Sequence, residues 1–445
     1  MQNLAQHSMI WLYRCLVTTT ALVALIPGLI VSKKLRQGLA GRWRQARQLS
    51  AGERKPTTSH TPSPRFLIHA ASGEFEYAKP VIRALKAEFP SCHITATYFS
   101  PSYAKNVHGF SEVDEAYYLP LDLSWSCRRF LRRLRPDLVL IARTDLWPEW
   151  LWQCRRQNIP VWLFSATKNL TQSGPVRGLT KSLRRFPYSL LEEIHCVSSE
   201  DRDQLIHLGL DSAKVFVGGD TRFDQVLHRL AQPKPLKEEL RPAFSKDQAI
   251  LVAGSTWTED ERALLPATRD LLAQSQLRLI IAPHEPSSSH IEGLKTLLNN
   301  LSLPFDIYST CKGPWTSPVL IIDQVGILAD LYSWGDLAFV GGSFKGPVHS
   351  VMEPLATGLV TLVGPRHQNN REAMEFQKLP LKEPSISMVL ACSSAEELSQ
   401  QLQQLVCSDL ERLRHSRTLI QTEVNNRRGA SQSLVERVAN RLPKT

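Results

Sequence analysis

The stretch FLIHAASGEFEYAKPVIRALK, from Phe66 to Lys86, contains the unit from which the fold can be built. It opens with an apolar run of the length and residue types of a buried strand. Gly73 and Glu74 mark a turn, and apolar residues then recur from Tyr77 at the spacing of an amphipathic helix. A strand, a turn and a helix in this order predict one repeat of an α/β sheet.

The same alternation recurs on both sides of Gln232–Gln248, a segment rich in proline and charge that interrupts the series. The apolar runs begin at Phe66, His93, Leu138, Val161, Ile194 and Val215 in the first half, and at Ala249, Arg278, Val319, Leu337 and Leu359 in the second. Continuous apolar strands separated by helices predict parallel sheets covered on both faces. We therefore expect two Rossmann-like, doubly wound domains facing a cleft, over residues 65–230 and 231–445.

A charge-free apolar stretch precedes the first domain. It runs from Cys15 to Ser32, and the residues from Lys33 to Lys55 are rich in lysine and arginine with a single acid, Glu53. A segment of roughly this length can reach across a bilayer, and a basic flank stays on the cytoplasmic side. We expect residues 1–64 to form a helical membrane anchor and a tether. Pro27 leaves open whether residues 15–32 span the bilayer or only embed in it.

The composition indicates a globular, basic chain with reduced cysteines. Hydrophobic residues make up 42% and charged residues 21% of the sequence, as in folded proteins. The 8 cysteines include no C-x-x-C pair, which argues against a disulfide framework or a structural metal. The net charge of +11 favours an anionic partner, such as nucleic acid, anionic lipid or a phosphorylated substrate. Neither first βα turn carries G-x-G-x-x-G, so a nicotinamide dehydrogenase is disfavoured.

Loops of the second half combine small residues with charge. Gly254, Ser255 and Thr256 end one predicted strand and precede an acidic helix start. The stretch FVGGSFKGPVHSVMEPLATG, residues 339–358, adds Gly341, Gly342, Ser343, Lys345, His349 and Glu353. Backbone N–H groups and Lys345 can bind a phosphate, and a carboxylate can accept hydrogen bonds from ribose hydroxyls. The sequence predicts a nucleotide site here; ordinary turns in which Ser255 or Thr256 only caps a helix are the alternative.

In the first half a carboxylate follows a strand directly. Glu74 stands at the expected start of a helix, where its ionised form is stabilised and can accept a proton from a hydroxyl. A solvated glutamate that only complements the helix dipole is the alternative. Arg143, Thr144 and Asp145 follow another strand of this half, and in a parallel sheet they would face the same edge as Glu74.

Seven motifs, in their order, carry a family resemblance. They are HAASGE (69–74), RTDLWPEW (143–150), VSSEDRDQLIHLG (197–209), GDTRFD (219–224), AGSTWTEDE (253–261), APHEP (282–286) and FVGGSFKGPVHSVMEP (339–354). Together they resemble the Kdo (3-deoxy-D-manno-octulosonic acid) transferases of lipopolysaccharide synthesis, membrane-anchored glycosyltransferases of the GT-B architecture. The resemblance extends from the apolar N-terminus to about Phe376.

The resemblance implies a reaction. CMP-Kdo would donate its sugar to a hydroxyl of the lipid A precursor, lipid IVA, and CMP would leave, with no metal and no other cofactor. Glu74 corresponds to the general base of the family. The resemblance places donor binding at Gly254–Thr256, at Pro283 and His284, and in the run from Gly341 to Glu353, and acceptor binding at Ser72, Gly73, Arg143 and Asp145.

Three motifs depart from the family pattern. His284 and Glu285 occupy the loop in which many members have arginine and histidine. Arg143 and Asp145 flank Thr144 where many members have two acids, and Ser350 replaces an asparagine.

The expected partners are CMP-Kdo, the lipid A precursor and the anionic surface of the inner membrane, and not nucleic acid, with no oligomeric state predicted. The chain would hold a single N-terminal anchor in the inner membrane with its domains on the cytoplasmic face. Basic segments at residues 126–136 and 181–187 could contact lipid phosphates. Two alternatives remain: another GT-B enzyme that uses a UDP-sugar, such as a GlcNAc transferase or an epimerase, and a non-catalytic, membrane-anchored binder of anionic lipid.

Overall fold

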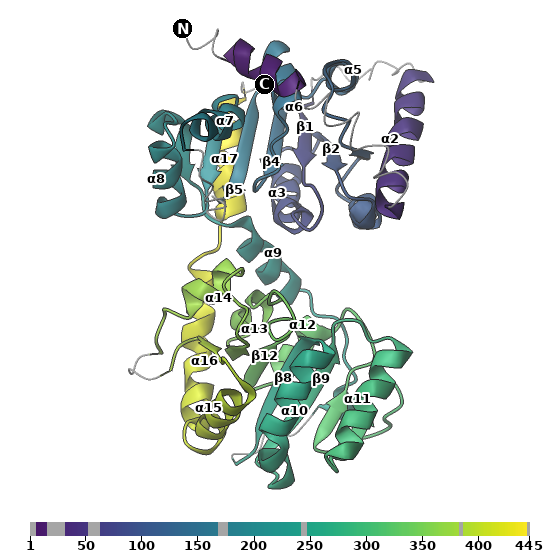
Figure 1. Cartoon of the computed structure of the whole chain (residues 1–445), viewed down its shortest axis with the longest axis vertical. Coiled ribbons are helices and arrows are strands. Elements are labelled where there is room, and N and C mark those ends of the chain that lie inside the picture. Colours follow the sequence, from purple (N-terminus) through teal and green to yellow (C-terminus); the bar gives the residue numbers. More distant parts are fainter. Residues whose placement is uncertain are drawn as a thin grey trace. The chain divides into compact units, whose positions relative to one another are not determined.

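The computed structural model describes residues 6–15, 32–51, 63–167, 177–241, 247–381 and 386–442. The chain divides into two units, the first comprising Met1–Gln225 with Arg428–Thr445 and the second Val226–Arg427. Each unit contains a seven-stranded sheet in which every strand pair is parallel (Figure 1). The prediction of two doubly wound α/β units is confirmed.

The first sheet has the order β3-β2-β1-β4-β5-β6-β7. Its strands are β1 (Arg65–His69), β2 (His93–Tyr98), β3 (Glu115–Tyr118), β4 (Leu138–Ala142), β5 (Val161–Ala166), β6 (Glu193–Cys196) and β7 (Val215–Val217). The order reverses between β1 and β4, which are neighbours in the sheet. In such sheets the reversal opens a crevice at the carboxyl ends of the strands, and ligands bind there.

Helices cover both faces of this sheet because alternate strand residues point to opposite sides. The helices of this unit are α2 (Lys33–Ala51), α3 (Phe75–Glu88), α4 (Ala104–His108), α5 (Ser124–Leu134), α6 (Pro148–Arg156), α7 (Arg177–Ser189) and α8 (Ser199–His207). Helix α2 lies along edge strand β3, and α9 (Thr221–Leu230) begins in the first unit and ends in the second. Leu67 and Val139 belong to one core, with residues of α5, α6 and α8. Ile68 and Leu140 belong to the other, with residues of α3 and α4.

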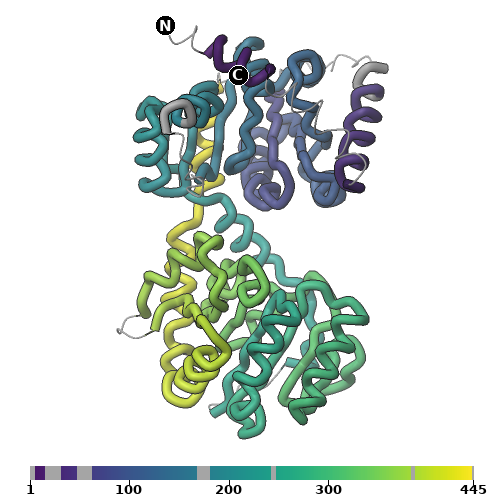
Figure 2. The backbone as a smooth tube through the Cα atoms, viewed as in Figure 1, coloured from purple at the N-terminus to yellow at the C-terminus, as the bar shows by residue number. Residues whose placement is uncertain are grey.

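The C-terminal helix α17 (Ala430–Arg441) belongs to the first unit, not to the second. Leu434, Val435 and Val438 are buried in the same core as α3, and Figure 2 shows the yellow helix among the purple-to-teal segments of that unit. Asp224 accepts hydrogen bonds from Gly429 N (2.7 Å) and from the N–H and hydroxyl of Ser431 (2.8 and 2.6 Å). The expected second domain, 231–445, therefore extended too far, because an apolar helix face does not indicate which sheet it covers.

The second sheet has the order β10-β11-β9-β8-β12-β13-β14. Its strands are β8 (Ala249–Thr256), β9 (Leu277–Pro283), β10 (Phe305–Ile307), β11 (Val319–Ile321), β12 (Leu337–Val340), β13 (Val360–Val363) and β14 (Val389–Ala391). Its helices are α10 (Thr258–Ala273), α11 (Ser288–Asn300), α12 (Leu328–Leu331), α13 (Met352–Ala356), α14 (Arg371–Phe376), α15 (Ala395–Cys407) and α16 (Leu410–Asn425). The order reverses between β8 and β12, so the carboxyl ends of β8, β9 and β12 meet at one edge.

Part of the expected anchor segment packs on the first unit. Residues 6–15 are helical, and Ile10 is buried in the core of that unit. Arg14 donates two hydrogen bonds, of 2.7 and 2.9 Å, to the carboxylate of Glu149, a residue with no exposed surface. Most of the apolar stretch, residues 16–31, lies outside the described residues, as do residues 1–5 and 52–62 of the expected anchor and tether. Within the described ranges, no helix combines the length and the apolar character needed to cross a membrane.

Candidate active site

The donor-site residues predicted in the second unit meet at the carboxyl edge of its sheet. Gly341 N donates to Gly254 O (2.9 Å), and His349 N donates to Gly341 O (3.1 Å). A Cβ on Gly341 would lie 2.4 Å from Ser255 O, so only glycine allows this approach of β12 to β8. Gly342 has φ +99°, a conformation that also favours glycine. The glycines are thus required by the backbone that forms the loop.

Asp260, in the first turn of α10, holds this loop in place. Its carboxylate accepts hydrogen bonds from Gly342 N (2.7 Å), Phe344 N (3.1 Å) and Trp257 N (2.9 Å), and the residue has no exposed surface. Burial raises the pKa of Asp260, although the three N–H groups oppose that shift. In the sequence, Asp260 is one of three consecutive acidic residues that open this helix. The position of Asp260 three residues after Trp257, at capping-box spacing, was the available signal.

An aromatic and cationic cluster covers the same edge. The rings of His284 and His349 stack with centroids 4.2 Å apart and planes 10° from parallel. Trp257 Nε1–H donates to His349 Nε2 (3.0 Å), so the proton of His349 is on Nδ1. Lys345 Nζ lies 3.9 Å from the centroid of the Trp257 ring. Three loops predicted to bind the donor therefore come together, with Trp257 as a member that the sequence analysis did not select.

The remaining predicted donor residues support the loops. Thr256 is fully buried and donates its hydroxyl proton to Glu261 Oε1 (2.9 Å). Ser343 is also fully buried, and its Oγ accepts a hydrogen bond from Gly364 N (2.6 Å). The hydroxyl of Ser350 donates to Glu353, so the serine that departs from the family pattern orients the acid predicted to contact ribose. Pro283 ends β9 directly before His284.

The stacked histidines predict a dependence of stability on pH. Burial, together with neighbouring His284, lowers the pKa of His349 to about 4 from its ordinary value of ~6.5. As the pH falls below 6.5 the unfolded chain binds a proton here and the folded chain does not. The stability linked to neutral His349 is therefore complete above pH 6.5 and is lost toward pH 4.

We therefore expect the free energy of unfolding to fall more from pH 7 to pH 5 in the parent than in His349→Gln. The difference should be about 1 kcal/mol, allowing for solvent screening of a half-buried ring. Urea denaturation of both proteins at the two pH values measures it. Equal losses in the two proteins would contradict the assignment.

In the first unit, Glu74 lies at the turn between β1 and α3. Its Oε2 accepts a hydrogen bond from Ser72 N (3.0 Å), which closes the turn ahead of the helix. The side chain is half-buried, and a Cβ on Gly73 would meet no atom within 4 Å. The turn is therefore open on the side of Gly73, and Glu74 stands at the carboxyl edge of the sheet, as predicted.

Arg143 and Asp145 follow β4, which pairs with β1, so they lie at the same edge as Glu74. Buried His69 contacts Asp145 Oδ2 through Nε2 (2.8 Å). Burial alone would raise the pKa of Asp145, but the hydrogen bond and charge of His69 hold that pKa below its ordinary value. Arg143, with φ +67°, donates to the hydroxyl of Tyr77 on α3. The expectation that these residues share one edge is confirmed, and His69 and Tyr77 are partners that the sequence analysis did not single out.

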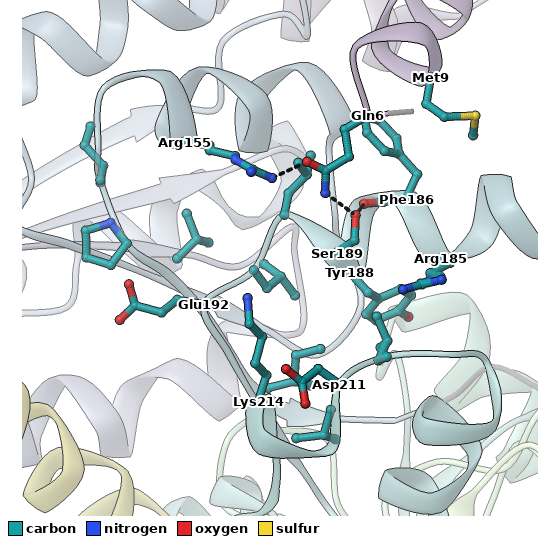
Figure 3. A pocket seen from close by; sticks show the side chains of 18 of the residues that line it. Gln6, Met9, Arg155, Arg185, Phe186, Tyr188, Ser189, Glu192, Asp211 and Lys214 are labelled. Carbon is teal, nitrogen blue, oxygen red and sulfur yellow. Dashed lines mark hydrogen bonds between the residues drawn. The ribbon is translucent and has the colours of Figure 1, made fainter. Parts of the chain in front are cut away.

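A further cavity of about 640 Å³ lies at the opposite, amino-terminal edge of the first sheet (Figure 3). Residues at or near the starts of β5, β6 and β7 line it, and Gln6 Nε2 donates to Ser189 Oγ (3.2 Å) on its wall. None of the predicted site residues lines this cavity. Among the described residues, no group of three or more His, Cys, Asp or Glu side chains is placed to hold a metal ion.

Comparison with solved structures defines the class of fold. The UDP-GlcNAc 2-epimerase of Neisseria meningitidis, bound to UDP-GlcNAc, matches with a TM-score of 0.57 and 16% identity, over 85% of this chain and 100% of that one. MurG of Acinetobacter baumannii matches with a TM-score of 0.53 and 14% identity, over the same shares. At these identities the likeness shows the fold alone: two parallel-sheet α/β domains that resemble GT-B glycosyltransferases.

Sequence relatives then define the family. The model of the 3-deoxy-D-manno-octulosonic-acid transferase (kdotransferase) family matches residues 41–225. The 3-deoxy-D-manno-octulosonic acid transferase of Haemophilus influenzae is 30% identical over 313 residues, 68% of this chain and 71% of the relative. That of Aquifex aeolicus is 26% identical over 315 residues, 69% and 78% of the two chains. The chain belongs to the 3-deoxy-D-manno-octulosonic acid transferase family of lipopolysaccharide biosynthesis and is a glycosyltransferase.

Proposed function

We propose that this chain transfers Kdo from CMP-Kdo to the lipid A precursor lipid IVA. The observation that carries the proposal is the meeting of Lys345, His284 and His349 at the carboxyl edge of the second sheet, where Asp260 holds the glycine loop. A cation beside a glycine-rich backbone suits the phosphate of a nucleotide sugar, and this edge is where doubly wound sheets bind nucleotides. Membership of the 3-deoxy-D-manno-octulosonic acid transferase family indicates that the transferred sugar is Kdo.

The first unit would hold the acceptor and the base. Glu74 takes the proton of the acceptor hydroxyl, and the hydroxyl oxygen forms a bond to the anomeric carbon of Kdo. The bond from that carbon to the phosphate oxygen breaks, and CMP leaves with the electron pair. The ammonium group of Lys345 stabilises the charge that develops on the departing phosphate. Arg143 and Asp145 would contact the acceptor at the edge they share with Glu74.

The acceptor suggests where the enzyme acts. A lipid A precursor is an anionic amphiphile, so an anchor in residues 15–32 and a basic first unit would keep the enzyme on the cytoplasmic face of the inner membrane. The net charge of +11 supports this location.

Incubation of the full chain with CMP-Kdo and the tetraacyl disaccharide bisphosphate tests the proposal. Mass spectrometry of the lipid should detect the addition of Kdo, and CMP should bind more tightly than UDP. Preferential binding of UDP, with a product that depends on a UDP-sugar, would replace the proposal by a UDP-sugar enzyme. Binding of anionic lipid without any nucleotide binding would replace it by a non-catalytic lipid binder.

A further inference from the structure

The first unit contains an apolar groove that the proposed reaction leaves unassigned. It has a volume of about 640 Å³ and lies between α2, α5 and the loop after β3. Figure 1 labels the two helices. Leu39 and Trp43 of α2 line one side, and Leu121, Trp125 and Phe130 line the other. Trp43 and Trp125 remain 59% and 61% exposed, which is unusual for the largest apolar side chain. A groove of this size can take a substantial part of a small ligand.

The charged residues that line the groove are all arginines. Neither α2 nor α5 contains an aspartate or glutamate, whereas both are rich in lysine and arginine. Arg47, Arg129 and Arg133 line the groove itself, and the guanidinium of Arg47 lies 3.6 Å from the Trp43 ring centroid. An apolar groove with exposed tryptophans and a basic rim complements an anionic amphiphile.

The groove is built on a fixed edge of the sheet. Gln45 of α2 donates to Tyr118 O (2.8 Å) and accepts from Tyr118 N (2.7 Å), so it pairs with edge strand β3 as a neighbouring strand would. A Cβ on Gly41 would lie 2.5 Å from the Tyr118 ring, so α2 approaches the strand closely. The wall formed by α2 is therefore held by contacts with the sheet.

The groove also lies at the same edge as the candidate acceptor residues. Arg42, which lines it, donates to the carbonyl oxygens of Leu119 (2.9 Å) and Phe99 (3.1 Å), which directly follow β3 and β2. The Phe99 ring stacks on Trp147 with centroids 5.1 Å apart. Trp147 belongs to the loop that carries Asp145. Aromatic contacts therefore connect the groove with the acceptor edge within one unit.

We infer that the α2–α5 groove binds an acyl chain of the anionic acceptor, while Arg47, Arg129 and Arg133 contact its phosphate. This inference rests on the proposed function. It adds that the groove lets the enzyme distinguish an acylated acceptor from a deacylated one. A deacylated acceptor would then lose the contacts in the groove but keep those near Glu74. The acceptor, not the bulk bilayer, is assigned because contacts of Arg42 with Phe99 and of Phe99 with Trp147 connect the groove with the acceptor edge.

Ala46→Trp tests the inference because it fills the groove from an exposed position on α2. Gln37→Trp makes the same change on α2 at an exposed position outside the groove and is the matched control. We expect Ala46→Trp to raise KM for the tetraacyl acceptor about 10-fold or more with a similar kcat, and to leave transfer to the deacylated disaccharide bisphosphate unchanged. Gln37→Trp should match the parent on both acceptors.

A binding measurement that needs no activity accompanies the kinetics. By calorimetry below its micelle concentration, dodecyl phosphate should bind parent and Gln37→Trp alike and Ala46→Trp about 10-fold more weakly. The uncharged dodecyl maltoside should bind the parent more weakly than dodecyl phosphate does. Equal dodecyl phosphate affinities in all three proteins would overturn the inference.

Three other outcomes separate the remaining interpretations. If Ala46→Trp loses binding to phosphatidylglycerol vesicles but keeps the parental KM for the tetraacyl acceptor in detergent, the groove serves the bilayer and the inference is wrong. If the parent transfers no Kdo to either acceptor, the proposed function fails. If the parent transfers Kdo and Ala46→Trp shows the same KM for both acceptors as the parent, only the groove assignment fails.

Discussion

Glu74→Gln is expected to reduce turnover by about 10²-fold or more while the fold and the affinity for CMP stay close to the parental values. A positioned general base contributes roughly 10²- to 10⁴-fold to rate, and a carboxamide cannot accept the proton of the acceptor hydroxyl. The amide oxygen can still accept the hydrogen bond that Ser72 N donates to Glu74 at 3.0 Å. Initial rates with CMP-Kdo and the tetraacyl acceptor, together with CMP titration, measure the effect.

Glu76→Gln is the matched control for this prediction. Glu76 lies two residues further into the same helix start and forms a 2.6 Å ion pair with Lys79, so it is engaged elsewhere. Glutamine keeps the shape of the side chain and an oxygen that can accept a hydrogen bond from Lys79, so turnover should stay close to that of the parent. If Glu74→Gln transfers Kdo at the rate of Glu76→Gln, Glu74 is not the base.

The fold could be predicted because its signals are local. Most strands of the two sheets are short apolar runs followed by a turn and a helix, as Phe66–Lys86 illustrates. The spacing of apolar residues in such a segment can be recognised without knowing the rest of the chain. The partner of a helix face is not local. Leu434, Val435 and Val438 form a helical stripe that would suit either sheet, and only the tertiary structure places it on the first.

Some features of the candidate site could likewise be predicted from the sequence, and others could not. Glycines such as Gly341 could be predicted, because a strand end that must approach another backbone needs a residue without Cβ. The contacts between the loops could not be predicted. Trp257 and His349 are 92 positions apart and meet only through the neighbouring ends of β8 and β12. Glu261 resembles any helix-opening acid until the structure shows that it accepts from Thr256 and contacts His290.

Asp260→Asn is expected to weaken CMP binding by about 10-fold or more and to lower the free energy of unfolding by about 1–3 kcal/mol. The carboxylate of Asp260 accepts hydrogen bonds from three backbone N–H groups, including those of Gly342 and Phe344. An asparagine keeps the shape but offers one acceptor oxygen, so at least one buried N–H group faces an amide nitrogen. A buried donor without a partner costs about 1–3 kcal/mol, and part of that strain would be released by displacing the loop.

The control for Asp260→Asn is Glu259→Gln, one residue earlier and exposed on the same helix turn. It removes one negative charge close to the loop without touching the hydrogen bonds, so its CMP affinity should stay within about 2-fold of the parent. Calorimetric titration with CMP and urea denaturation measure the two effects for each variant. Asp260→Asn could lose stability and still bind CMP as tightly as Glu259→Gln. In that case either the loop from Gly341 to Lys345 keeps its nucleotide-binding form without Asp260, or the nucleotide binds elsewhere. Either result would show that nucleotide binding does not depend on Asp260 as proposed.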